Sequence, residues 1–190
     1  MENEGLRKKM SPALRKPRVG LFVGAMEWYW TMTGMEKLRQ AVVADARRLS
    51  ELLTAAGLEL IDSGLVASHQ ESAAAGNRFR EEKVDLAVFY HGTYVDDKMT
   101  FAFLEEYGDG PLILAHTQGL DSIPEEFTLI DYARCWGNNS SVQIISTAKR
   151  MAPNRHIGYV FGHMPQAATQ IASYARAAKA ISNMRRYKIA

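Results

Sequence analysis

Apolar and polar residues follow one repeating order along the chain: a short run of β-forming residues, a polar stretch, then a longer segment with helical spacing. Short apolar runs predict strands, and apolar residues three or four positions apart predict helices with one buried face. The predicted strands are residues 18–24, 58–61, 84–90, 112–115 and 156–161. The predicted helices are residues 35–56, 68–83, 98–107, 138–151 and 166–184. Residues 138–141 are expected to cap the fourth helix, and the charged residues of the first, Asp45 among them, to face solvent.

This alternation of strands and helices defines the predicted fold class, which is α/β. Strands joined by helices lie parallel, with right-handed crossovers. The run at 84–90 is almost wholly apolar, as expected for a strand that is covered on both faces. We therefore predict a doubly wound parallel five-stranded sheet with the flavodoxin-like order 2-1-3-4-5. Residues 17–190 are expected to form this domain, and residues 1–16 a flexible basic leader.

Composition and charge narrow the class of protein further. With 190 residues, 47% of them hydrophobic and 23% charged, the chain is expected to form one globular domain. A net charge of +2 is too small to indicate a nucleic-acid partner. No apolar run reaches the roughly 20 residues of a membrane helix, and the leader lacks the apolar core of a secretory signal. The single Cys135 excludes an internal disulfide and fits a cytoplasmic protein with one inert thiol.

The segment after the first strand is the first candidate for function, because open parallel sheets bind ligands beyond the carboxyl ends of their strands. It contains Glu27, Trp28, Tyr29 and Trp30. No G-x-G-x-x-G motif follows the strand, which argues against a dinucleotide site. The aromatic rings suit the apolar face of a sugar, and equally a subunit interface. Glu27 is either a general acid or base, or a carboxylate that stabilises the start of the next helix.

Three histidines, His91, His116 and His163, stand at or just after the ends of predicted strands. The carboxyl ends of parallel strands meet at one edge of a sheet, so the three rings and Gln118 could line one polar cleft. A strand-end histidine that bonds the backbone is the simpler explanation for each ring alone. A three-histidine metal site is the sharper alternative, and it requires all three rings within about 2.1 Å of one ion. The residues alone therefore predict a binding domain for a small polar ligand.

Five short motifs stand in a fixed order along the chain. They are residues 20–30, residues 89–91 with 98–99, residues 111–118, residues 131–151 and residues 159–163. In this order they resemble the N-terminal domain of the L-arabinose isomerase and L-fucose isomerase family. The resemblance covers residues 17–190.

The resemblance implies a metal-dependent aldose–ketose isomerase in which Mn²⁺ or another divalent metal orients the sugar oxygens. In such enzymes the metal ligands and the acid/base pair belong to later domains, so this chain is expected to contain no catalytic residue and to bind no metal. The N-terminal domain closes over the active site of a neighbouring subunit, which implies a homo-oligomer, a trimer or hexamer. The expected substrate-binding residues are Glu27, Trp28, Tyr29, His91, His116, Gln118, Asn138, Asn139 and His163.

The segment at 136–139 departs from the arabinose enzymes. Those enzymes have a Gln and a His in this segment, and Asn139 stands at the aligned His position. The turn after the first strand is also unusually aromatic. L-Arabinose itself is therefore not assigned as the substrate. The alternative function is a stand-alone sugar-binding or sensory module without catalysis.

Overall fold

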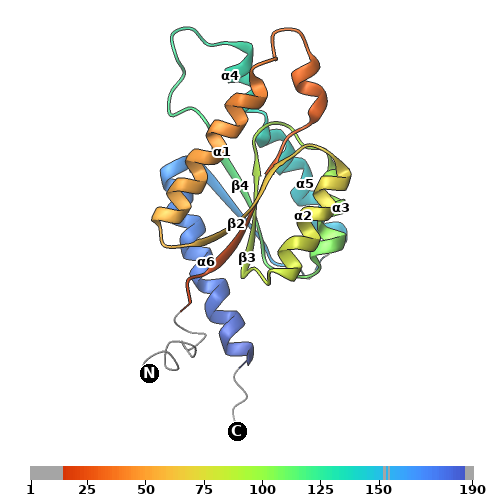
Figure 1. Ribbon diagram of the computed structural model, residues 1–190, viewed down its shortest axis with the longest axis vertical. Helices are drawn as coiled ribbons and strands as arrows, with labels where there is room; N and C mark the ends of the chain where they lie inside the picture. Colours follow the sequence, from red (N-terminus) through yellow and green to blue (C-terminus); the bar gives the residue numbers. More distant parts are fainter. Residues whose placement is uncertain (1–14, 152, 154, 187–190) are drawn as a thin grey trace, which may run out of the picture.

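Five parallel strands form one sheet in the order β2-β1-β3-β4-β5 in the computed structural model, which describes residues 15–151, 153 and 155–186 (Figure 1). The strands are β1 (Arg18–Gly24), β2 (Glu59–Val66), β3 (Leu86–His91), β4 (Leu112–Gln118) and β5 (Ile157–His163). Every neighbouring pair is parallel. The predicted fold class and strand order are confirmed. The predicted leader lies almost entirely outside the described residues.

Helices cover both faces of this sheet (Figure 1). Helices α1 (Leu38–Ala55) and α6 (Met164–Arg186) pack over one face, and α2 (His69–Glu81), α3 (Asp97–Tyr107) and α5 (Gly137–Met151) over the other. The short 3-10 helix η3 (Glu27–Thr31) and helix α4 (Leu129–Arg134) lie beyond the carboxyl edge. None of the described helices combines the length and the apolar character needed to cross a membrane.

The central strand β3 shows why the sheet is buried on both faces. Its residues Val88 and Tyr90 belong to the core under α1 and α6, whereas Ala87 and Phe89 belong to the core under α2, α3 and α5. Side chains of a strand alternate between faces, so a strand between two helical layers must be apolar at every position. The ring of Phe89 stacks on Phe22 of β1 with centroids 4.2 Å apart, which ties the two central strands together.

Strand β2 is longer than predicted, because Asp62, Ser63 and Gly64 do not end it. Asp62 still pairs with Leu21, and Ser63 and Gly64 form a bulge at which the pairing with β1 shifts between Leu21 and Val23. The Ser63 hydroxyl accepts the Val23 N–H at 3.3 Å, and Gly64 takes φ of +69°, which favours glycine. A polar triplet can therefore continue the strand when its side chains replace the missing ladder bonds.

Candidate functional site

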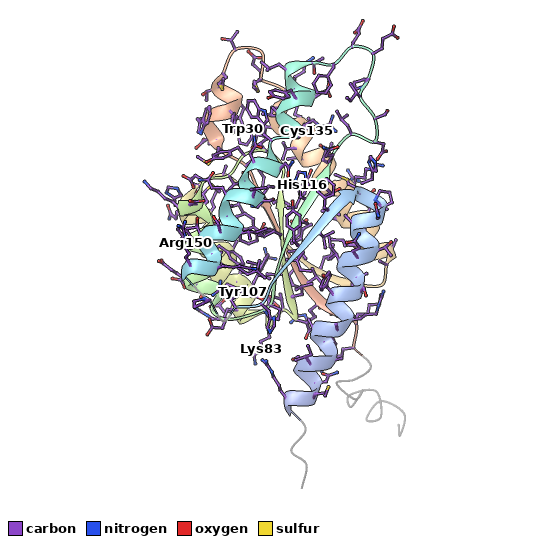
Figure 2. The ribbon with its side chains drawn as sticks, turned by 180° about the vertical axis from the view of Figure 1, so that it is seen from behind. Trp30, Lys83, Tyr107, His116, Cys135 and Arg150 are labelled. Carbon is purple, nitrogen blue, oxygen red and sulfur yellow. The ribbon has the colours of Figure 1, made fainter. Side chains whose placement is uncertain are left out.

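The carboxyl edge of the sheet carries the first candidate residues. The turn after β1 is fixed by two backbone bonds: Ala25 N–H donates to Val66 O at 3.0 Å, and Gly92 N–H to Gly24 O at 2.9 Å. From this turn η3 projects over the edge. Figure 2 shows Trp30 and Cys135 at the end of the molecule where His116 lies, with Lys83 and Tyr107 at the opposite end. Trp30, Cys135 and His116 thus share one end of the molecule.

Four aromatic rings, which we call the aromatic row, contact one another at this edge. Trp28 stacks on Tyr29 with centroids 3.9 Å apart, Tyr29 lies 5.1 Å from Trp136, and Trp136 meets Tyr132 edge-on at 5.3 Å. The ends of the row, Trp28 and Tyr132, are 48% and 53% exposed, whereas Tyr29 is buried. Burial, with a smaller effect of nearby Tyr94, raises the pKa of Tyr29 to about 12. The aromatic row therefore has an accessible ring at each end, Trp28 and Tyr132, and a buried, uncharged Tyr29 between them.

Helix α5 brings the next candidates to the same edge. The polar residues 138–141 were expected to cap this helix, but α5 already begins at Gly137, so that prediction is wrong. The Ser140 hydroxyl instead accepts the Val95 N–H at 2.6 Å, and Ser141 bonds the ring of His91. These two buried hydroxyls fasten the start of α5 to the end of β3. As a result Asn138 lies half-buried and Asn139 exposed beside Trp136, whose carbonyl accepts the Asn139 N–H.

Gly137 allows this close approach of α5 to the sheet. A methyl group at this position would collide with the carbonyl oxygen of His91. Alanine is otherwise about 1 kcal/mol better than glycine in a helix. We expect Gly137→Ala to lower the free energy of unfolding by about 1–3 kcal/mol, because backbone cannot move aside like a side chain. Urea unfolding measures this change.

The matched control for that variant is Ser146→Ala, since Ser146 lies on the exposed side of the same helix. Ser146→Ala should change the free energy of unfolding by less than about 0.5 kcal/mol. A stabilised Gly137→Ala variant would contradict the close packing at this position.

His91 and His116 lie in the strands below the aromatic row. Each is only 3% exposed. The Nδ1 of His91 lies 3.0 Å from the Ser141 hydroxyl, and the His116 ring stacks on Phe161 with centroids 5.1 Å apart. Burial lowers the pKa of His116 to about 4 and, with a smaller effect of His116, that of His91 to about 3. Both imidazoles are therefore uncharged near neutral pH.

The remaining predicted residues are more exposed. His163 ends β5 with a side chain that is 58% exposed and lies 4.0 Å from Asp121, so it does not join the buried pair in a three-histidine cluster. Gln118 is half-buried at the end of β4. Glu27 is exposed in the first turn of η3, and the side chain at the N-cap, Met26, makes no capping bond. Glu27 thus has the dipole-facing position expected of a helix-starting carboxylate.

An ion pair that the sequence pattern did not predict supports the site. Asp45 is buried on α1 and binds Arg134 of α4 through both carboxylate oxygens, at 2.7 and 2.6 Å. The same guanidinium donates to the Gly119 carbonyl at 3.2 Å, which holds the loop after β4. The expectation that Asp45 faces solvent is wrong. Its spacing gave the signal, because Asp45 shares the buried face of α1 with Val42 and Leu49.

No group of three or more His, Cys, Asp or Glu side chains is placed to hold a metal ion in the described part of the chain. Cys135 is half-buried, and burial raises the pKa of its thiol, which disfavours the reactive thiolate. A depression of about 180 Å³ lies between α1 and β2 and is lined in part by Val23, Ala46 and Leu65.

Comparison with known proteins adds no assignment: no protein-family model matches the chain, and neither does any curated protein. The chain is an α/β domain of flavodoxin-like arrangement with exposed aromatic side chains beyond the carboxyl edge of its sheet. Its function is inferred from this geometry and from the sequence motifs.

Proposed function

We propose that this chain is the substrate-recognition and oligomerisation domain of a metal-dependent aldose–ketose isomerase of the L-arabinose/L-fucose type. The contact between Tyr29 and Trp136, with centroids 5.1 Å apart, carries the proposal. The resemblance assigns the turn at 26–29 and the segment at 136–139 to one substrate contact. The two segments are far apart in the sequence, yet they share the aromatic row.

The chemistry of the edge suits a neutral, hydroxyl-rich ligand. The exposed ring of Trp28 offers a flat apolar surface for the C–H face of a sugar. The amides of Asn138 and Asn139 can each donate and accept hydrogen bonds, and Glu27 can accept them from hydroxyl groups. This combination of a few polar groups with aromatic walls is typical of small-molecule sites.

In this proposal the edge also meets a neighbouring subunit. Several large apolar side chains are exposed there on η3, on α4 and in the segments beside them: Trp28, Met32, Phe127, Leu129 and Tyr132. Aromatic residues and Met are enriched at the cores of subunit interfaces. A homo-oligomer, a trimer or hexamer in the cytoplasm, would bury this surface and place it over the partner's active site. The Mn²⁺ or other divalent metal and the acid/base pair would lie in the catalytic domains of the same or the neighbouring subunit.

The sugar contact is tested with Trp28→Ala. We expect the dissociation constant of the best-binding aldose to rise about 5–10-fold, since an aromatic contact contributes roughly 1 kcal/mol. Isothermal titration calorimetry of the chain with a panel of aldoses measures it. The matched control is Tyr174→Ala on α6, because Tyr174 is 46% exposed and Trp28 48%. Equal affinities for Trp28→Ala and the unaltered chain would contradict a sugar site on the aromatic row.

Turnover separates the domain from a complete enzyme. The 190-residue chain, incubated with Mn²⁺ and the same aldoses, should show no appreciable isomerisation, because its described residues offer no metal-binding group. Appreciable turnover would contradict the proposal that the metal ligands and the acid/base pair lie in other domains. The stand-alone module is distinguished by the reading frame after the codon for Ala190. A further ~300 residues with Glu and His ligands favour the isomerase, and a stop codon favours the module.

A further inference from the structure

Near the carboxyl end of the sheet, four residues lie side by side on the neighbouring strands β1, β3, β4 and β5. Gly24 of β1 pairs with His91 of β3, and His116 of β4 pairs with Phe161 of β5. The register of β3 with β4, continued by one residue from its last pair, sets His91 beside His116. Alternation along both strands puts the two rings on the face that α5 covers, since Phe89 and Leu114, two residues earlier, lie in that core. The two imidazoles are therefore neighbours within one layer.

The outer ring nitrogens of this pair have hydrogen-bonding capacity that no protein group uses. Nε2 of His91 and Nε2 of His116 are both buried, and neither has a partner among the described residues. Buried polar atoms in proteins are nearly always hydrogen-bonded, so two unpartnered nitrogens in adjacent side chains are unusual.

Ser141 determines which proton His91 carries. The Ser141 hydroxyl donates its single hydrogen to the Gly137 carbonyl at 3.1 Å, so toward the ring it can only accept. The bond between Ser141 and His91 Nδ1, at 3.0 Å, is then an N–H donated by the ring. A neutral imidazole has one N–H, and therefore Nε2 of His91 carries a lone pair. The structure thus presents a fixed hydrogen-bond acceptor in the buried pair.

A fixed acceptor discriminates among ligands. An anion is disfavoured because the lone pair would face it. A divalent cation is disfavoured because the described residues provide no third ligand and no carboxylate or thiolate at the pair to offset the charge. A neutral hydroxyl group fits, because it can donate a hydrogen bond to a ring nitrogen that carries a lone pair. Polyols and sugars are rich in such hydroxyl groups, and a sugar is the ligand class of the proposed function.

Phe161 stacks on the ring of His116. Its ring lies nearly parallel to His116, at an interplanar angle of 23°, yet it is 58% exposed. Exposed side chains change rotamer within picoseconds to nanoseconds, so Phe161 can turn away without movement of the backbone. Tyr159, two residues earlier on the same face of β5, is 37% exposed.

We propose that His116 and His91 form an acceptor pair that binds the hydroxyl groups of a polyol or sugar admitted when Phe161 turns away from His116. This inference rests on the proposed sugar-binding function. It adds the ring nitrogens that bind the hydroxyl groups, the tautomer of His91 and the side chain, Phe161, that must move. In this inference the buried histidines bind hydroxyl groups of the ligand, whereas the exposed aromatic row contacts the apolar face of its ring.

The test follows the imidazole nitrogens directly. The chain is labelled with ¹⁵N-histidine and titrated with L-arabitol, then with L-arabinose, and ¹⁵N imidazole spectra are recorded. We expect a saturable upfield shift of the Nε2 signals of His91 and His116, because a lone pair that gains a hydrogen bond is shielded. His69 on α2, whose side chain is 51% exposed and which is not among the expected site residues, is the internal reference. Nε2 signals that do not move with either probe would overturn the inference.

Two variants address the gate and the acceptor. Phe161→Ala should lower the dissociation constant of L-arabitol, because no Phe161 ring then covers the histidine pair for part of the time. His116→Phe keeps an aromatic ring and removes the acceptor, and it should weaken L-arabitol binding at least tenfold. Unchanged affinity in both variants would overturn the inference. If the effect of Trp28→Ala is observed while the imidazole signals stay fixed, the proposed function stands and the acceptor pair falls. If neither responds, both fall.

Discussion

Asp45→Ala is expected to lower the free energy of unfolding by about 3–5 kcal/mol, the cost of leaving one member of a buried ion pair alone. The Arg134 side chain is only 15% exposed, and it would keep its charge without the two carboxylate oxygens that it now binds at 2.6 and 2.7 Å. Its remaining carboxylate partner is Asp131, at 3.3 Å. Urea unfolding followed by circular dichroism measures the change.

The matched control lies on the same helix. Glu51→Ala removes the exposed ion pair of Arg47 with Glu51, and it should cost no more than about 0.5 kcal/mol. The double variant Asp45→Leu/Arg134→Leu should be more stable than Asp45→Ala, because it leaves no buried charge without a partner. A loss below about 1 kcal/mol for Asp45→Ala would show that α4 opens readily and that the pair does not hold the edge together.

The order of the sheet followed from the sequence because each strand is marked by a dense local signal. Strands β3 and β4 are buried at nearly every residue, so apolar runs with polar segments between them identify them. Once five such runs alternate with helices, right-handed crossovers leave few arrangements. The weakest signal belonged to β2, where Ser63 and Gly64 look like a turn but form a bulge.

The support of the site could not be predicted in the same way, because it depends on contacts between distant segments. Asp45 was assigned to solvent by its charge, since only the fold reveals that Arg134 lies opposite. Ser140 and Ser141 look like a helix cap in sequence, although each bonds a group near the end of β3. Polar residues that serve a tertiary contact have the same local appearance as caps and solvent-exposed positions. The edge itself was predictable, and the hydrogen bonds that fix it were not.

Acid is expected to destabilise the protein well before most carboxylates titrate, through the two buried histidines. Burial, with a smaller effect of His116, lowers the folded-state pKa of His91 to about 3, and burial lowers that of His116 to about 4. An unfolded histidine has a pKa near 6.5, so on acidification the unfolded chain binds these protons first. The stabilisation is complete above about pH 6.5 and is lost as the pH falls toward the folded values.

The quantity to measure is the slope of the free energy of unfolding against pH. Below about pH 6 each histidine should remove about 1.4 kcal/mol per pH unit, so the pair should lower the free energy of unfolding by roughly 4 kcal/mol between about pH 7 and 5. Ordinary Asp and Glu side chains titrate below this pH range, so urea unfolding between about pH 7 and 5 reports on the histidines. His116→Phe should halve the slope, and His163→Gln, which removes an exposed ring, is the matched control. Equal slopes for His116→Phe and the unaltered protein would mean that His116 reaches water in the folded state, because a hydrated imidazole takes up its proton without unfolding.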